Sequence, residues 1–212
     1  IAGRRAAVFA GGSGGTSYFE LPAEIFRGIS DGGGITVTAW VNPGHSRSPW
    51  ERIFDFGRSE HGPYLFLTRN LRGVCYCDGD IAADPLSTCA PGEWVHIAMT
   101  VSGTKGGTLS SAGPVIYENG EPAADGQISQ TASGTYKKLR EWFASFENGE
   151  NYVRNYIGRS QFAVDADFAG AISDFRIYAD ALEADEILDI MCESLAEGEI
   201  LAPAAKRLNV HH

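Results

Sequence analysis

The sequence predicts an all-β domain, an antiparallel β-sandwich that carries one or two short helices. Short runs alternate apolar and polar residues with the period of a half-buried strand. Gly, Asn and Pro separate these runs, and most neighbouring runs have no helical pattern between them, which is typical of antiparallel sandwiches. The chain has 212 residues, 43% of them hydrophobic, which suffices for one large core, so we expect a single domain.

Eight segments of the chain have the pattern of a strand. Residues 6–9 and 17–21 predict a hairpin at the start of the chain. The run 35–42 (ITVTAWVN) ends at a Pro-Gly turn, and its alternation directs Ile35, Val37, Ala39 and Val41 toward the core. The same alternation predicts strands at 52–57, 64–68, 94–101, 115–117 and 171–178.

Two segments have the apolar spacing of a helix, residues 136–146 and 182–192. We expect both to be short helices packed on the sandwich. The pattern fades after Ala196, so residues 1–196 are expected to form the domain and 197–212 a C-terminal linker or surface arm. His211 and His212 resemble the remnant of a purification tag and enter no metal-binding argument.

Charge and hydropathy exclude two classes of partner. The formal net charge is −10, and much of the acidity lies in residues 180–199, which read as a solvated helix face and tail. A phosphate backbone is therefore an unsuitable partner, and we expect no nucleic acid binding. No apolar run approaches the roughly 20 residues that span a bilayer, so no membrane span is predicted. The chain starts at Ile1 and reads as a piece of a longer protein.

The four cysteines are Cys75, Cys77, Cys89 and Cys192. Cys75 and Cys77 lie two apart on an expected strand, so they face the same side and do not easily bond each other. A hairpin centred near residue 82 would bring Cys75 opposite Cys89, and we favour that disulfide, with Cys77 as the other candidate partner of Cys89. The spacing does not match a structural zinc site. Cys192 is expected to be a small buried residue on a helix.

The strand series as a whole resembles the laminin-G-like jelly-roll modules of the concanavalin-A-like lectin and glucanase superfamily, found in secreted bacterial multidomain proteins. The pieces that carry the resemblance span most of residues 5–190: TVTAWVNP (36–43), WERIFDFG (50–57), YLFLT (64–68), GEWVHIAMTVSG (92–103), YENG (117–120), NYIGRSQ (155–161) and FAGAISDFRIYADALEADEI (168–187). The resemblance implies a concanavalin-A-like jelly roll, an extracellular or cell-surface location, and a neighbour in the parent chain that acts on glycans.

Some relatives hold a structural calcium ion through oxygen ligands, so the resemblance makes calcium a possible cofactor. Two departures weaken this implication. The family often carries Asp in the first strand where this chain has Ala10, and a pair of acids where this chain has Ser173 and Asp174. The fold resemblance alone does not identify a ligand, because function depends on sites that vary within a fold.

The superfamily includes glucanases, and retaining glycoside hydrolysis requires two carboxylates about 5 Å apart. The chain has no E-x-D-x-x-E run, and its G-G-S-G-G stretch (11–15) lacks the spacing of a serine nucleophile elbow. We therefore expect no catalytic residues. Asp55 and Arg176 are charged residues inside otherwise apolar strands, and we interpret them as a structural polar pair rather than as ligand groups. His96 is expected on the outer surface of a sheet, in a structural role.

Sugars stack their apolar face on aromatic rings and bind hydroxyls to polar side chains, so aromatic residues in loops are the informative ones. Trp40 and Trp94 lie inside strands and are assigned to packing. The candidate ligand-binding residues are Trp50, His61, Tyr64, Trp142 and Tyr152. We expect a non-catalytic, carbohydrate-binding recognition module of a larger secreted protein. The alternatives are a structural module that packs on a neighbouring catalytic domain, an adhesin-type module that binds protein, and a hydrolase.

Overall fold

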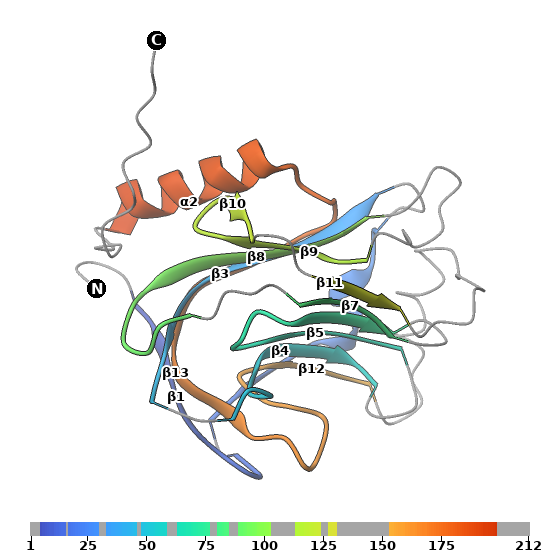
Figure 1. The fold of residues 1–212 in the computed structure, drawn as a ribbon, viewed down its shortest axis with the longest axis vertical. Helices are drawn as coiled ribbons and strands as arrows, with labels where there is room; N and C mark the ends of the chain where they lie inside the picture. The colour runs from blue at the N-terminus through green and yellow to red at the C-terminus, as the bar shows by residue number, and fades with distance from the viewer. Residues whose placement is uncertain are drawn as a thin grey trace.

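The fold is a two-layer β-sandwich with a helix on the outside of one layer (Figure 1). The structure is a computed structural model, which describes residues 5–15, 17–29, 33–45, 48–58, 63–76, 80–84, 89–102, 113–123, 127–130 and 153–198. Within these residues the strands form one continuous hydrogen-bonded sheet that folds over on itself. The predicted helix at 136–146 lies outside the described residues. The predicted all-β fold class is confirmed.

The first layer is antiparallel throughout and has the strand order β10-β9-β8-β3-β13-β1. Its strands are β1 (Ala7–Gly12), β3 (Gly34–Pro43), β8 (Val95–Ser102), β9 (Val115–Glu118), β10 (Glu121–Pro122) and β13 (Asp167–Tyr178). In Figure 1 this layer lies between α2 and the remaining strands.

The second layer has the strand order β2-β12-β4-β5-β6-β7-β11. Its strands are β2 (Phe19–Leu21), β4 (Arg52–Gly57), β5 (Tyr64–Thr68), β6 (Gly73–Tyr76), β7 (Asp80–Asp84), β11 (Gln127–Gln130) and β12 (Arg154–Ile157). The two layers join at one parallel pairing between Asp167 of β13 and Arg52 of β4.

The core fills the space between the layers. The predicted inward residues of β3, Ile35, Val37, Ala39 and Val41, all belong to it, which confirms the alternation. From the second layer, Phe54 and Phe56 contact Phe175 of β13, with ring centroids 6.1 and 6.4 Å apart. Burial of side chains of this size stabilises the fold by about 1.5–3 kcal/mol each. The core therefore buries the inner face of each layer, so a ligand site has to lie on an outer face or at an edge.

The hairpin predicted at the start of the chain is wrong. β1 pairs with β13 in the first layer, whereas β2 pairs with β12 in the second. Gly11 and Gly12 have φ of 70° and 99°, so the chain leaves β1 in a conformation that suits glycine and crosses to the other layer. Phe9 and Phe19 still meet edge to face at 6.0 Å, but across the layers rather than within a hairpin.

The second predicted helix is confirmed as α2 (Ala184–Gly198), shifted toward the C-terminus from the expected 182–192. Its start is fixed by Glu186, whose carboxylate accepts a hydrogen bond (2.9 Å) from the backbone N–H of Glu183. α2 packs on the outer face of the first layer. A short 3-10 helix, η1 (Ala23–Phe26), follows β2 and was not predicted.

The predicted disulfide between Cys75 and Cys89 is not formed, because Cys89 is a buried free thiol. β6 and β7 pair with Tyr76 opposite Asp80, so Ile81 is the residue opposite Cys75. Residues 80–84 are the strand β7 rather than a turn. Burial raises the pKa of Cys89 to about 12. Cys192 was expected to be buried but is exposed, on the face of α2 that also carries Asp185 and Asp189.

Candidate functional site

The outer face of the second layer carries a cluster of aromatic rings. On β5, Leu65 and Leu67 enter the core, whereas Tyr64 and Phe66 point to the opposite face. Their rings stack at 5.5 Å, and Phe162, from the loop between β12 and β13, meets both edge to face at 5.5 and 6.2 Å. The structure places the predicted ligand residue Tyr64 inside this cluster, only 7% exposed. Its hydroxyl donates a 2.6 Å hydrogen bond to Asp80, so Tyr64 supports the face.

Arg52 is the charged centre of this face. Its guanidinium lies 3.9 Å from the centroid of the Phe66 ring, and the residue is 1% exposed. It forms ion pairs with Asp165 (2.7 Å) and Asp55 (3.4 Å) and donates a hydrogen bond (2.6 Å) to the backbone carbonyl of Trp50. This buried cation is therefore neutralised by two carboxylates and ties the turn before β4 to the loop before β13.

Asp55 is fully buried beneath that same loop. The backbone N–H and the side-chain amide of Gln161 donate hydrogen bonds to its carboxylate at 3.0 and 3.1 Å. Burial raises the pKa of Asp55 to about 6, against the lowering effects of Arg52 and of these hydrogen bonds. Asp55 thus anchors the loop that carries Phe162.

The predicted polar pair of Asp55 with Arg176 is wrong, because the two side chains lie on opposite outer faces with the core between them. Arg176, on β13, pairs with Asp174 at 2.8 Å and bonds Ser194 of α2. Asp55, on β4, pairs with Arg52 instead. Each charged residue does lie in an internal polar network, but the networks are separate. The sequence shows strand alternation but not which layer a strand joins.

Trp50 is the exposed aromatic residue of this face. It lies in the turn before β4 and is 40% exposed. The guanidinium carbon atoms of Arg52 and Arg72 lie 5.6 and 5.4 Å from the centroid of its ring. The structure therefore places an accessible indole beside the guanidinium of Arg72, an arrangement that suits a ligand with an apolar face and hydroxyls around it.

A second aromatic group on this face was missed by sequence reasoning. Tyr156 of β12 lies opposite Asp55 in the sheet, and its ring meets that of Tyr18 edge to face at 5.2 Å. The guanidinium carbon of Arg159 lies 4.5 Å from the Tyr18 ring and 5.1 Å from the Tyr156 ring. The clue in the sequence was NYIGRSQ (155–161), in which Tyr156 alternates with the core residue Ile157. We call Tyr18, Tyr156 and Arg159 the tyrosine–arginine platform.

Three further candidates, His61, Trp142 and Tyr152, lie outside the described residues, so they remain predictions from the sequence. Trp40 is fully buried and packs with Met191 of α2 and with the partly buried Trp94, in line with its assignment to packing.

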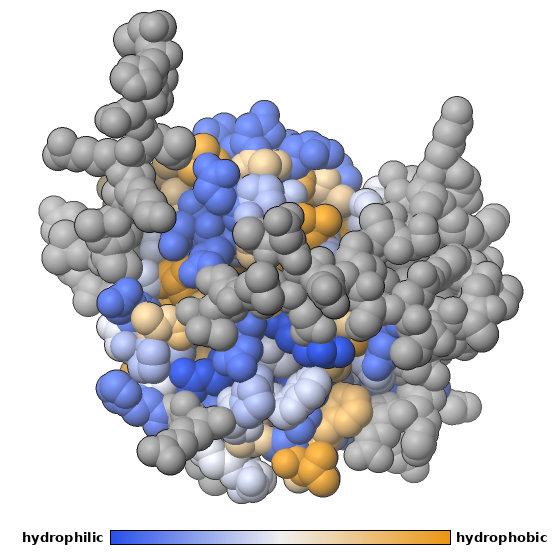
Figure 2. Space-filling model, viewed as in Figure 1, coloured by the Kyte–Doolittle hydropathy of each residue, from blue (hydrophilic) through white to orange (hydrophobic). Residues whose placement is uncertain are grey.

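α2 packs on the outer face of the first layer, around Trp40 and Ala98. His96 faces this side as expected, but it is covered rather than exposed: it is 1% exposed and its ring lies 5.3 Å from that of Trp40. Within the described ranges its Nδ1 has no hydrogen-bond partner, and burial lowers the pKa of His96 to about 4. The outward side of α2 is hydrophilic (Figure 2). α2 therefore covers this face around Trp40 and Ala98, whereas Val8 of β1 (78%) and Val115 of β9 (41%) remain exposed.

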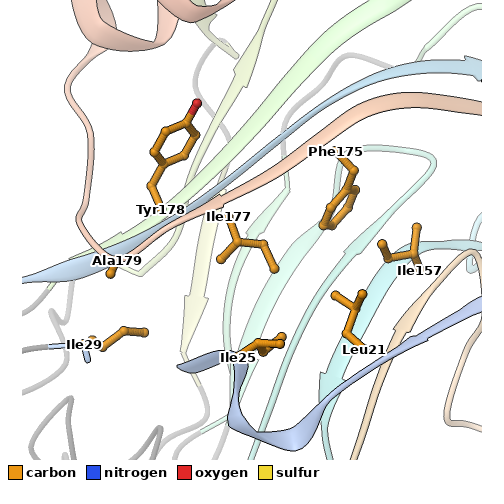
Figure 3. Close-up of a pocket in the computed structure, with 8 residues that line it drawn as sticks. All are labelled: Leu21, Ile25, Ile29, Ile157, Phe175, Ile177, Tyr178 and Ala179. Atoms are coloured by element: carbon orange, nitrogen blue, oxygen red, sulfur yellow. The ribbon is translucent and has the colours of Figure 1, made fainter. Parts of the chain in front are cut away.

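An apolar pocket of about 460 Å³ opens between the two layers, beside β2 and η1 (Figure 3). Isoleucine and leucine side chains point into it together with Phe175, while Tyr178 points away. Its described lining residues are Leu21, Ile25, Ile29, Ile157, Phe175, Ile177, Tyr178 and Ala179. A sugar placed there would leave its hydroxyls without partners, so this pocket is a poorer candidate than the face around Trp50.

Within the described part of the chain, no group of three or more His, Cys, Asp or Glu side chains is arranged to hold a metal ion. The described acids that gather on the second layer, Asp55 and Asp165, pair with Arg52. These residues thus do not fit the calcium site that some relatives carry. None of the described helices has the length and apolarity to cross a membrane.

A two-layer antiparallel sandwich with an exposed aromatic and polar face defines a lectin-like class of protein. The chain belongs to the concanavalin A-like lectin/glucanases superfamily, whose family model matches residues 13–188. This match confirms the resemblance and the jelly-roll class inferred from the strand series. No curated protein sequence matches the chain.

Solved structures share the fold at low identity. Domain 4 of AbnA, an extracellular GH43 arabinanase from Geobacillus stearothermophilus in complex with arabinotriose, has 19% identity and a TM-score of 0.56, over 88% of this chain and 76% of that one. A Trypanosoma rangeli sialidase has 14% identity and a TM-score of 0.52, over 93% of this chain and 29% of the sialidase. The binding domain of botulinum neurotoxin DC, in complex with rat synaptotagmin II, has 15% identity and a TM-score of 0.50, over 91% and 46%.

Proposed function

We propose that this domain binds glycan on the outer face of its second layer, as a non-catalytic recognition module of a larger secreted glycan-active protein. The observation that carries the proposal is the 40% exposed ring of Trp50 beside Arg72. A sugar ring has an apolar face that stacks on indole, and hydroxyls that accept hydrogen bonds from a guanidinium. The backbone of Trp50 is held in place by the buried Arg52, which donates a hydrogen bond to its carbonyl and pairs with Asp165.

The similarity to domain 4 of the arabinanase supports the proposal. That domain is a part of an extracellular enzyme and was solved with arabinotriose. The present chain spans only 29% of the sialidase that it resembles, which fits a module within a longer chain.

The carboxylates of the site favour binding over hydrolysis. Asp55 and Asp165 both contact the Arg52 guanidinium, and Asp55 is fully buried. A glycosidase uses one carboxyl group as an acid and the other as a base or nucleophile, both in contact with the glycosidic bond. Here the two acids support the position of Arg52 and of the loop above it.

The test is a glycan-array screen of the domain, with and without calcium, repeated with Trp50→Ala and Trp142→Ala. Loss of stacking on Trp50 is expected to weaken binding by about fivefold, since aromatic contacts of this kind contribute about 1 kcal/mol. Val115→Ala is the matched control, because Val115 is equally exposed (41%) but lies on β9 in the other layer.

Selective binding that Trp50→Ala weakens and Val115→Ala preserves would support the proposal. Trp142→Ala tests a candidate residue that was inferred from the sequence alone. Binding that survives Trp50→Ala unchanged would move the site elsewhere. A domain that binds no glycan in either condition would instead be assigned to packing against a neighbouring domain or to protein recognition.

A further inference from the structure

Arg159 differs from three other arginines of the second layer, because among the described residues it has no acidic partner. Arg52 pairs with Asp55 and Asp165, Arg69 with Glu51, and Arg154 with Glu20. The Arg159 guanidinium contacts the rings of Tyr18 and Tyr156, and among the described residues it forms no ion pair or hydrogen bond. It is partly exposed, so a net positive charge faces solvent at this point.

The two rings hold this guanidinium in a fixed orientation. Contacts of an arginine with an aromatic face contribute about 0.5–1 kcal/mol at exposed sites, and more when water is excluded. A guanidinium lying on a ring keeps its N–H groups at its edge, where a planar carboxylate can accept two parallel hydrogen bonds. The platform therefore presents a preformed receptor for one carboxylate.

The acidic residue beside Tyr156 on the neighbouring strand is paired with another arginine. Glu20 lies opposite Tyr156 on the neighbouring strand β2, but its carboxylate pairs with Arg154 at 3.3 Å. The charges of Glu20 and Arg154 offset each other and leave that of Arg159. Burial raises the pKa of Tyr156, so its hydroxyl stays protonated at neutral pH and remains a donor.

The platform lies on the same face as Trp50. Tyr156 is opposite Asp55 on β4, and Asp55 is opposite Phe66 on β5, the residue on which Arg52 stacks beside Trp50. Two strand spacings separate Tyr156 from Phe66, which is roughly 10 Å. An oligosaccharide can bridge this distance and contact both the platform and Trp50.

We infer that the glycan bound by this domain carries a carboxylate, as a uronic or other acidic sugar does, and that Arg159 on Tyr18 and Tyr156 receives it. This inference rests on the proposed function and adds the class of sugar to it. With a net charge of −10 the molecule as a whole repels polyanions, so the preference arises at this one position and weakens with added salt.

The test compares acidic oligosaccharides with their neutral counterparts. An array presents uronic-acid oligosaccharides, each beside its carboxyl-reduced form and a form with sulfate in place of the carboxylate. The domain is expected to prefer the carboxylate form by about tenfold at low salt, in keeping with a charge-assisted bidentate contact. Arg159→Gln should abolish this preference, so that the acidic and reduced forms bind equally, while Arg159→Lys should retain only part of it.

Two controls separate the contact from net charge. Arg27→Gln removes the same charge from the segment after η1, and Glu20→Gln with Arg154→Gln removes the neighbouring ion pair with no change of net charge. Both should keep the preference. Equal binding of acidic and reduced forms, a preference that survives Arg159→Gln, or equal binding of sulfate and carboxylate would overturn the inference and leave glycan binding intact. Binding to no sugar at all would reject the proposed function itself.

Discussion

His96 of β8 is buried beside Trp40, with the two ring centroids 5.3 Å apart. It lies on the predicted face of β8, yet α2 covers it, and desolvation lowers its pKa from 6.5 to about 4. The charged groups facing it, Asp174 and Arg176, have opposing effects on this pKa. Between pH 6.5 and 4 the unfolded chain therefore binds a proton at His96 that the folded chain does not, so this residue makes stability fall as pH decreases.

The prediction concerns His96→Gln. Between pH 7 and pH 5 the wild-type protein should lose about 2 kcal/mol of unfolding free energy that the variant does not lose, since each pKa unit corresponds to 1.36 kcal/mol. Urea denaturation at the two pH values measures this difference. Asp55, whose pKa is raised to about 6, acts in the opposite direction but is present in both proteins and cancels.

His45→Gln is the control, because His45 is exposed and should leave the pH dependence as it is. Equal pH dependence of His96→Gln and wild type would mean that His96 is protonated in the folded state.

For single residues, the sequence indicated which side chains are able to bind a sugar better than it indicated which of them are exposed. Trp50 was identified from its place after an exposed turn, and the structure finds it exposed. Tyr64 was chosen by the same reasoning but is buried by Phe162, which comes from a loop about a hundred residues further along the chain. The tyrosine–arginine platform was missed because its residues come from two separate segments, and only the pairing of β2 with β12 brings them together.

Among the elements, α2 covers the outer face of the first layer through a few apolar side chains. Ile187 is fully buried against Ala98 and Tyr117, whereas Asp189, two residues later, is exposed. Gly120 allows the approach, since a side chain there would meet Leu188 at 2.7 Å. The helix therefore contributes buried apolar contacts to the stability of the domain.

Substitution of Ile187 by Ala should lower the unfolding free energy by about 2–4 kcal/mol, because it leaves a cavity under α2. Asp189→Ala should change it by less than about 0.5 kcal/mol. Denaturation of both variants in urea measures the effect, and glycan binding should persist in both because the proposed site is on the other layer. A small, equal effect of the two substitutions would show that α2 is not packed on the sheet.

The elements themselves were largely predictable. Residues 52–57 and 64–68 are strands with the expected bounds, since their alternation reflects burial of one face. Pairing was less predictable: β1 and β2 are neighbours in sequence and read as a hairpin, but they join different layers. Local patterns specify which side of a strand is buried, while the choice of partner depends on contacts between distant segments.

For the molecule as a whole, one outer face of the sandwich packs against α2, and the other carries the site that we propose for glycan binding. One face is closed by α2 over Trp40 and His96, and the other carries Trp50 and the tyrosine–arginine platform. Family membership and the layer architecture were accessible from the order of strand motifs. Which outer face is covered and which is exposed could not be predicted from the sequence. It depends on where α2 and the loop that carries Phe162 pack on the sheet.

The cysteines give the molecule a built-in reporter of its own opening. The Cys89 thiol is buried and has a pKa of about 12, so almost no thiolate is present at neutral pH to react with an alkylating reagent. Cys192 is exposed on α2 and should react at once. Mass spectrometry of the labelled chain would then time two events in one sample: the label on Cys192 records the supply of reagent, and the label on Cys89 records how often the sandwich comes apart.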